Sequence, residues 1–258
     1  MADFLRKLFR RKQQPPLVCA VSLDDHGHPV GDDPNHKHTA ACFIDFEPLA
    51  VVELFQSQSC PSCHVAVPGI LAGVNSPNLL LLTFNISLFD HTGWKDTYAN
   101  GTSDQRHRAY ATRWQRKTLF APQIVVNGVA DGSGAGGGSD VAEAVQQARA
   151  AQAARPWRIY LDANDTDVRI DSDAEAVGNH DILVVQYQAG DEKVKVGKGP
   201  NKGKKLDHRN RVTSVTKIGE WAGGNLTAAL PALRSGENAV VVVQEGGAGG
   251  AIVAVAKV

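Results

Sequence analysis

This sequence has no run of about 18 apolar residues, the length that a membrane-spanning helix requires. Neither charge is in excess, since 27 basic residues balance 27 acidic ones. No overall field therefore draws the protein to nucleic acid or to an anionic membrane, and an electrostatic partner must be recruited by a local patch. Four cysteines in 258 residues do not make a disulfide-stapled secreted scaffold. The apolar content of 43% is typical of a globular protein.

Residues 1–47 are predicted to form an N-terminal extension. Residues 1–12, MADFLRKLFRRK, mix basic and apolar side chains, whereas a secretory signal needs an uninterrupted apolar stretch. This segment predicts a cytoplasmic protein, and it could lie on a membrane surface as a short amphipathic helix or be a simple basic terminus. Pro15 and Pro16 end any helix there, and residues 24–38 have the composition of a loop.

Residues 48–155 are predicted to fold as an α/β domain. Short apolar runs indicate buried strands, and Asn127-Gly128 is a strong hairpin signal. Asp140 is expected to cap the last helix. The order β-α-β-α-β-β-α is that of a thioredoxin-like domain. The expected strands are 49–55, 79–86 and 123–126, and the expected helices are 61–71, 105–114 and 140–155.

Residues 156–258 have a different pattern, with strand-like runs separated by turn residues and no helical period. Such spacing is typical of an antiparallel β-sandwich, which we expect as a second domain. The expected strands are 158–161, 167–170, 182–187, 192–196, 212–218, 239–244 and 251–256.

The strongest chemical signal is Cys60-Pro61-Ser62-Cys63, between a predicted strand and a predicted helix. Two cysteines at this spacing can close a small disulfide, and the helix N-terminus stabilises a thiolate. Cys60 would be the nucleophile, and Cys63 would resolve the mixed disulfide. Half of a zinc site is an alternative that needs further ligands. An inert remnant is another.

Ala121-Pro122 directly precedes the third predicted strand. In thioredoxin-like folds a cis-proline at this place packs against the Cys-x-x-C motif and leaves backbone free to pair with a substrate peptide. An X-Pro bond is seldom cis by default, so it is the combination with the motif that favours a cis bond here. We therefore expect Pro122 in the active site and Ala121 at the substrate.

These motifs resemble the DUF1223 family, whose role is largely unassigned. The resemblance runs from about residue 49 to residue 258, and it implies a thioredoxin-like domain followed by a β-rich domain. It implies no substrate. Family members commonly begin with a secretory signal, from which residues 1–47 depart. The matching segments are 52–63 (VELFQSQSCPSC), 93–96 (GWKD), 106–110, 121–128 (APQIVVNG) and 208–210 (HRN).

Three further residues are candidates for assisting the dithiol. Glu53, on the strand leading to Cys60, could shuttle a proton to the resolving thiol. It could equally be a structural acid bonded to backbone or to Lys95. Trp94 could shield the dithiol and Lys95 could stabilise a thiolate, although a packed corner with an ion pair explains both residues too.

Metal binding is a rival reading that draws on the extension. Each His-x-His pair could chelate a transition metal in an extended chain, or belong to a solvated loop. Cys19 and Cys42 bracket this loop, and they could form a disulfide, a second redox pair or free thiols. The four histidines are His26, His28, His36 and His38.

Two other patterns resemble ligand-binding loops but lack essential features. Residues 132–139 (GSGAGGGS) contain G-x-G-x-x-G without a full strand before it, so we interpret them as a flexible loop. Residues 198–205 (KGPNKGKK) lack the G-K-[ST] of a phosphate loop. They are expected to form a basic hairpin that could guide an acidic partner.

The sequence therefore predicts a thiol–disulfide oxidoreductase with a redox-active disulfide and no dissociable cofactor. Its partners would be a thiol or disulfide substrate and an unidentified electron donor, with no nucleic acid. The alternatives are a copper- or zinc-handling protein that uses the dithiol and the histidine loop, and a non-catalytic thioredoxin-like interaction module.

Overall fold

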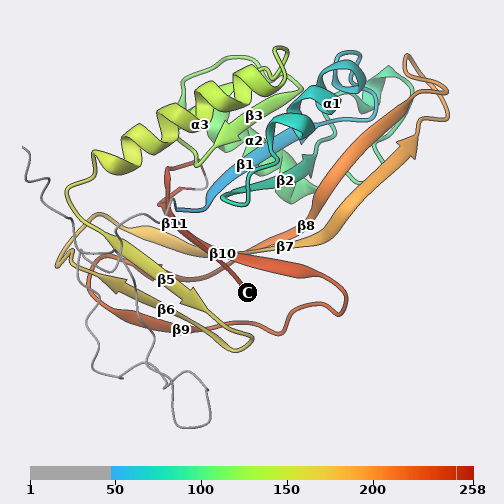
Figure 1. Ribbon diagram of the computed structural model, residues 1–258. Helices are drawn as coiled ribbons and strands as arrows, with labels where there is room; N and C mark the ends of the chain where they lie inside the picture. Colours follow the sequence, from blue (N-terminus) through green and yellow to red (C-terminus); the bar gives the residue numbers. More distant parts are fainter. Residues whose placement is uncertain (1–47, 248) are drawn as a thin grey trace, which may run out of the picture. The chain divides into compact units, whose positions relative to one another are not determined.

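The computed structural model describes residues 48–247 and 249–258 (Figure 1). The residues from Pro48 onward form one compact unit. The basic terminus, the His-x-His pairs, Cys19 and Cys42 lie outside the described residues. No helix in the described part is both long enough and apolar enough to cross a membrane.

The first part of the unit has the predicted order of strands and helices. Its strands are β1 (Ala50–Gln56), β2 (Leu79–Asn85), β3 (Gln123–Val126) and β4 (Ala130–Gly132). Its α-helices are α1 (Cys63–Gly73), α2 (Gly101–Arg113) and α3 (Gly138–Ala153), and a short 3-10 helix, η2 (Asp90–Thr92), follows β2. Every residue of β1 is buried, which explains why the strand is apolar apart from Glu53 and Gln56.

The helix ends differ in part from the sequence-based expectation. The side chain of Asn100 accepts a hydrogen bond from the Ser103 N–H and caps α2. Asp140 was expected to cap α3, but Gly137 occupies that position and Asp140 lies in the first turn. The Asp140 carboxylate still favours this helix end, because it accepts the Gly136 N–H and lies near the positive end of the helix dipole.

The second part consists of strands, as predicted, but β7 and β8 are longer than the runs suggested. The runs at 182–187 and 192–196 belong to one strand, β7, and the run at 212–218 is only part of β8. β9 was not predicted. The strands are β5 (Ile159–Ala163), β6 (Asp167–Ser172), β7 (His180–Lys195), β8 (Lys205–Trp221), β9 (Leu226–Ala229), β10 (Asn238–Glu245) and β11 (Ile252–Lys257).

Strands from both parts share one mixed sheet of eight strands, in the order β11-β10-β7-β8-β2-β1-β3-β4. The junction is the parallel contact of β2 with β8, where Thr83 pairs with Arg211 and the Thr83 hydroxyl donates to the Arg209 carbonyl at 2.6 Å. A separate three-stranded sheet, β5-β6-β9, packs through Val168 and Ile170 against Ile182 and Val184 of β7. The strand-rich half thus continues the sheet that carries the first half.

The two faces of β1 enter different cores. Val52 and Leu54 belong to the core that contains Cys60, Cys63 and apolar residues of α1 and α3. Val51 and Phe55 belong to the core on the opposite face, together with Tyr110 of α2 and residues of β7 and β10. This alternation follows from the period of two in a strand, and it decides which side chains of β1 can reach the two cysteines.

Candidate functional site

The cysteine pair lies where α1 begins. Cys63 is the first residue of the helix, and Cys60 lies three residues earlier, after the loop that follows β1. The Cys63 N–H donates to the Cys60 sulfur at 3.2 Å, and the Cys60 thiol donates to the Ala121 carbonyl, also at 3.2 Å. Both cysteines are free thiols.

The pKa values of the two thiols are shifted in opposite directions. A hydrogen bond from the Cys63 thiol lowers the pKa of Cys60, and the Ser62 and Cys63 N–H groups add to this effect, against the contribution of burial. Burial raises the pKa of Cys63 well above its ordinary value, and the hydrogen bond to Cys60 raises it further. The thiolate is therefore more stable on Cys60 than on Cys63.

Both cysteines are closed to solvent. Each has 0% relative exposure, although Pro61 and Ser62 between them are exposed and Val65 is 72% exposed. A sulfur atom of a partner molecule can contact the Cys60 sulfur only if a neighbouring group moves. Any reaction at this site therefore requires a movement that exposes Cys60.

The proline segment lies directly against Cys60. The Ala121–Pro122 peptide bond is cis, as predicted, and Ala121 is partly exposed while Pro122 is buried. The Ala121 carbonyl is the acceptor for the Cys60 thiol. Pro122 leads into β3, which pairs with β1, so the sheet fixes this segment beside the cysteine loop.

The loop from residue 57 to residue 59 is held by the segment that contains Trp94. The Trp94 indole donates to the Gln58 side-chain oxygen at 2.8 Å, and the Ser59 hydroxyl donates to the Trp94 carbonyl at 2.6 Å. Trp94 therefore acts on the loop before the dithiol, and both alternatives stated for it, shielding and corner packing, remain compatible with this place. Lys95 next to it is exposed to solvent.

A buried carboxylate that sequence reasoning missed lies behind the same loop. Asp96 accepts the Gln58 N–H at 2.8 Å and the Asn85 side-chain amide at 3.0 Å. Burial raises the pKa of Asp96, although these donors oppose the change. The negative charge of Asp96 also contributes to the raised pKa of Cys63. The family-like segment 93–96 was the available signal for this residue.

The tip of the β7–β8 hairpin contacts the cysteine loop from the other half of the chain. Asn201 is buried at 2% exposure, and its side-chain amide donates to the Cys60 carbonyl at 2.7 Å and to the Gln58 carbonyl at 2.9 Å. Gly197 lies against the Trp94 ring, because a Cβ added there would be 2.7 Å from a ring carbon. Sequence reasoning had no signal for this contact across 141 positions.

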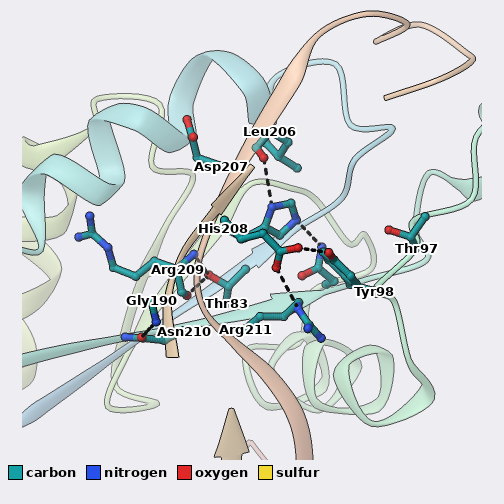
Figure 2. A network of polar contacts seen from close by, with 12 residues as sticks. Thr83, Thr97, Tyr98, Gly190, Leu206, Asp207, His208, Arg209, Asn210 and Arg211 are labelled. Atoms are coloured by element: carbon teal, nitrogen blue, oxygen red, sulfur yellow. Dashed lines mark hydrogen bonds and ion pairs between the residues drawn. The ribbon is translucent and has the colours of Figure 1, made fainter. Parts of the chain in front are cut away.

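His208, Arg209 and Asn210 belong to β8 and contact residues of the first half (Figure 2). His208 contacts the Leu206 carbonyl through Nδ1 and the Asn85 amide through Nε2, both at 3.1 Å. Burial lowers the pKa of His208 to about 4, so the ring is neutral at pH 7. Nδ1 then carries the proton and Nε2 accepts from Asn85. Asn85 thus links Asp96 to His208 of β8.

Glu53 lies on the face of β1 opposite the cysteines. Its carboxylate is paired with the Arg106 guanidinium, with one contact at 3.2 Å, and it accepts the Tyr110 hydroxyl. Arg106 also donates to the Gln244 side chain at 3.0 Å. Glu53 is therefore paired with Arg106 rather than with Lys95, on the face of β1 away from Cys63.

The metal-binding hypothesis requires ligand side chains that lie close together. Among residues 48–247 and 249–258, no group of three or more His, Cys, Asp or Glu side chains is placed to hold an ion. His64 follows Cys63, and burial lowers its pKa, with a smaller contribution from the positive charge of Lys204. The four histidines of the metal hypothesis lie in the part of the chain that the structure does not describe.

The fold and the site define a mixed α/β protein with a buried Cys-x-x-C pair at the start of a helix. Residues 51–244 match the family model described as "Protein of unknown function (DUF1223)", and the chain therefore belongs to the DUF1223 family. No curated protein matches the chain significantly.

Two solved structures are similar to this chain. One is the X-ray structure of a structural-genomics target from Agrobacterium tumefaciens, at 25% identity with a TM-score of 0.64, and the match covers 83% of this chain and 95% of that chain. The other is HBP35 of Porphyromonas gingivalis, at 10% identity with a TM-score of 0.49, covering 83% of this chain and 75% of that chain.

Proposed function

We propose that the protein is a thiol–disulfide oxidoreductase with a thioredoxin-like arrangement of its first half. The observation that carries the proposal is the placement of the two thiols at the start of α1, where the Cys63 N–H donates to the Cys60 sulfur at 3.2 Å, and where the pKa of Cys60 is lowered while burial raises that of Cys63. A lowered pKa makes Cys60 the better nucleophile, and a raised pKa keeps Cys63 protonated until it is needed. The cis-proline segment beside Cys60 supports the same role.

The reaction begins when the Cys60 thiolate attacks one sulfur of a substrate disulfide. A Cys60–substrate disulfide forms, the substrate S–S bond breaks, and the second substrate sulfur leaves as a thiolate that takes up a proton. Cys63 then loses its proton and attacks the Cys60 sulfur, which releases the first substrate thiol. The net change oxidises the protein dithiol to a disulfide and reduces the substrate disulfide to two thiols.

The backbone around Cys60 supplies what this reaction requires. The N–H groups at the start of α1 stabilise the negative charge on the Cys60 sulfur. Asp96, behind the loop, is the buried carboxylate on the dithiol side of the molecule, and it is a better candidate than Glu53 to take part in proton movement at Cys63.

The experiment is a single-turnover reaction of the fully reduced protein with oxidised glutathione, followed by mass-spectrometric mapping of all four cysteines. We expect a Cys60–Cys63 disulfide in the wild type and a trapped glutathione on Cys60 in Cys63→Ala. A Cys60→Ala variant should leave Cys63 unmodified over the same time. Modification confined to Cys19 and Cys42 would refute the proposal.

A second candidate, a non-catalytic interaction module, is favoured by the closure of both thiols. In that case the pair would pack as two small apolar side chains, which is how buried free cysteines commonly behave. Native Cys60 would then react with iodoacetamide only as fast as the whole protein unfolds. Alkylation of Cys60 that is much faster than global unfolding, measured by hydrogen exchange under the same conditions, excludes the module.

A further inference from the structure

The hairpin tip beside the dithiol carries positive charge only. We define the lysine tip as residues 196–205, from the residue after β7 to the first residue of β8. It contains no aspartate or glutamate, in a chain whose total charges balance. All four of its lysines are exposed: Lys198, Lys202, Lys204 and Lys205.

The lysine tip has a defined conformation. The Gly203 N–H donates to the Val196 carbonyl at 2.8 Å, and the Val196 N–H donates to the Lys204 carbonyl at 2.9 Å. Two further bonds, from Lys202 to the Gly199 carbonyl and from Lys204 to the Asn201 carbonyl, complete the turn. The charges are therefore displayed from a fixed scaffold.

Asn201 places this scaffold against the nucleophile. Its side chain lies 2.7 Å from the Cys60 carbonyl, and the Lys204 ammonium lies 3.4 Å from the Asn201 side-chain oxygen. One buried residue thus separates a lysine charge from the backbone of Cys60. Burial lowers the pKa of His64, the residue after Cys63, and the positive charge of Lys204 lowers it further.

The lysines of the tip have no ion-pair partner among the described residues. In residues 48–247 and 249–258, none of the four ammonium groups takes part in an ion pair. The nearest acid along the chain, Asp207, is paired with Lys193 at 2.9 Å. Asp96, close to the cysteine loop, is buried. A molecule that approaches Cys60 from this side therefore meets uncompensated positive charge.

We propose that the lysine tip selects disulfide substrates whose sulfur atoms are flanked by carboxylates. This inference rests on the proposed thiol–disulfide exchange and names its substrate class. Several charges of one sign beside a reacting group attract an oppositely charged substrate. This attraction raises the association rate by on the order of tenfold or more at low ionic strength. The exchange step itself is the one given above, with the acidic disulfide as the oxidant.

The experiment compares two disulfides that differ only in charge, the homodimers of acetylated, amidated Glu-Cys-Glu and Lys-Cys-Lys tripeptides. The fully reduced protein is mixed with each, and formation of the Cys60–Cys63 disulfide is followed under single-turnover conditions, so that no electron donor is needed. Each rate constant is divided by that of free dithiothreitol with the same tripeptide, which removes intrinsic reactivity. We expect the acidic disulfide to react about tenfold faster at low salt.

Charge reversal on the tip provides the variants. Lys202→Glu should lower the acidic-to-basic rate ratio by about threefold, and Lys198→Glu/Lys202→Glu should reduce it to one or below, in line with the size of such steering. Lys257→Glu, an exposed lysine at the end of β11, changes the net charge equally and should leave the ratio unchanged. Raising the ionic strength to about 0.5 M should also abolish the preference in the wild type.

The outcomes separate the two proposals. If neither tripeptide disulfide oxidises the Cys60–Cys63 pair, the proposed function fails. If both oxidise it with the same normalised rate, or if Lys257→Glu lowers the ratio as much as Lys202→Glu, the exchange stands and the lysine tip has no role in selection. Oxidised glutathione, a third probe with carboxylates, distinguishes a small anionic disulfide from an acidic peptide by its rate relative to the Glu-Cys-Glu dimer.

Discussion

The side-chain amide of Asn201 donates a hydrogen bond to the backbone carbonyl of Cys60 at 2.7 Å. The contact joins the tip of the β7–β8 hairpin to the residue with the more acidic thiol. It therefore makes the position of Cys60 depend on a part of the chain that follows the α/β segment, and it suggests the first of five tests.

Asn201→Asp should destabilise the protein by about 2–4 kcal/mol, because a carboxylate would face two backbone carbonyl oxygens in a buried site. Asn201→Ala should cost about 1–3 kcal/mol through two unsatisfied carbonyl groups. Both are measured by urea unfolding, with Lys202→Ala as the exposed neighbouring control. Equal stability of all three variants would show that the contact does not hold the loop.

Cys63→Ala should raise the pKa of Cys60, because the hydrogen bond from the Cys63 thiol is the largest cause of its lowering. The pH dependence of iodoacetamide alkylation at Cys60, mapped by mass spectrometry, measures this change. In Cys60→Ala, the remaining Cys63 should stay unreactive up to pH values above those at which free cysteine reacts. A Cys63 that alkylates at lower pH than Cys60 would reverse the assigned roles.

Glu53→Gln should cost about 3–5 kcal/mol of stability, because it leaves the buried Arg106 guanidinium without its counter-charge. It should leave the alkylation pH profile of Cys60 unchanged, since Glu53 faces the opposite core. Urea unfolding and alkylation are measured on the same preparation. A shifted Cys60 profile in a folded Glu53→Gln protein would place Glu53 in the chemistry after all.

His208 should make the protein less stable as the pH falls. Its pKa is about 4 in the folded protein and 6.5 ordinarily, so the unfolded chain binds the extra proton between these values. Its contribution is complete above about pH 6.5 and is lost toward pH 4, to a total of about 3 kcal/mol at 1.4 kcal/mol per pKa unit. Unfolding from pH 4 to 7 should show a flatter dependence in His208→Gln, and parallel curves would contradict the assignment.

Gly73→Ala should destabilise the protein by about 1–3 kcal/mol, because the added Cβ would lie 2.6 Å from the Gly138 Cα where α1 meets α3. Gly101→Ala, in the first turn of α2 with nothing within 4 Å of the new Cβ, should be neutral or stabilising by up to about 1 kcal/mol. Thermal unfolding of the two variants gives the comparison. A loss at Gly101→Ala as large as that at Gly73→Ala would show that the close approach of α1 to α3 is not the cause, since Gly101 has nothing within 4 Å of the new Cβ.

Local sequence patterns predicted the elements that depend on local interactions. Apolar runs located β1, β2 and β3, and Asn127-Gly128 formed the predicted turn, with positive φ at both residues. The long strands β7 and β8 were read as shorter runs because their outer ends are exposed and charged, with pairing rather than apolar content extending them. The Asp140 cap was wrong because the glycine turn before α3 supplied the cap position at Gly137.

The sequence by itself determined the Cys60-x-x-Cys63 pair and its place before a helix, because both depend on residues close together in the chain, and it predicted the cis Ala121–Pro122 bond from the combination of this proline with the motif. Only the tertiary structure decided which side chains surround the pair. It placed Glu53 on the far face of β1, Asp96 behind the cysteine loop and Asn201 on the Cys60 carbonyl. These contacts depend on sheet order, and pairing β2 with β8 joins segments more than a hundred residues apart, for which no local pattern carries information.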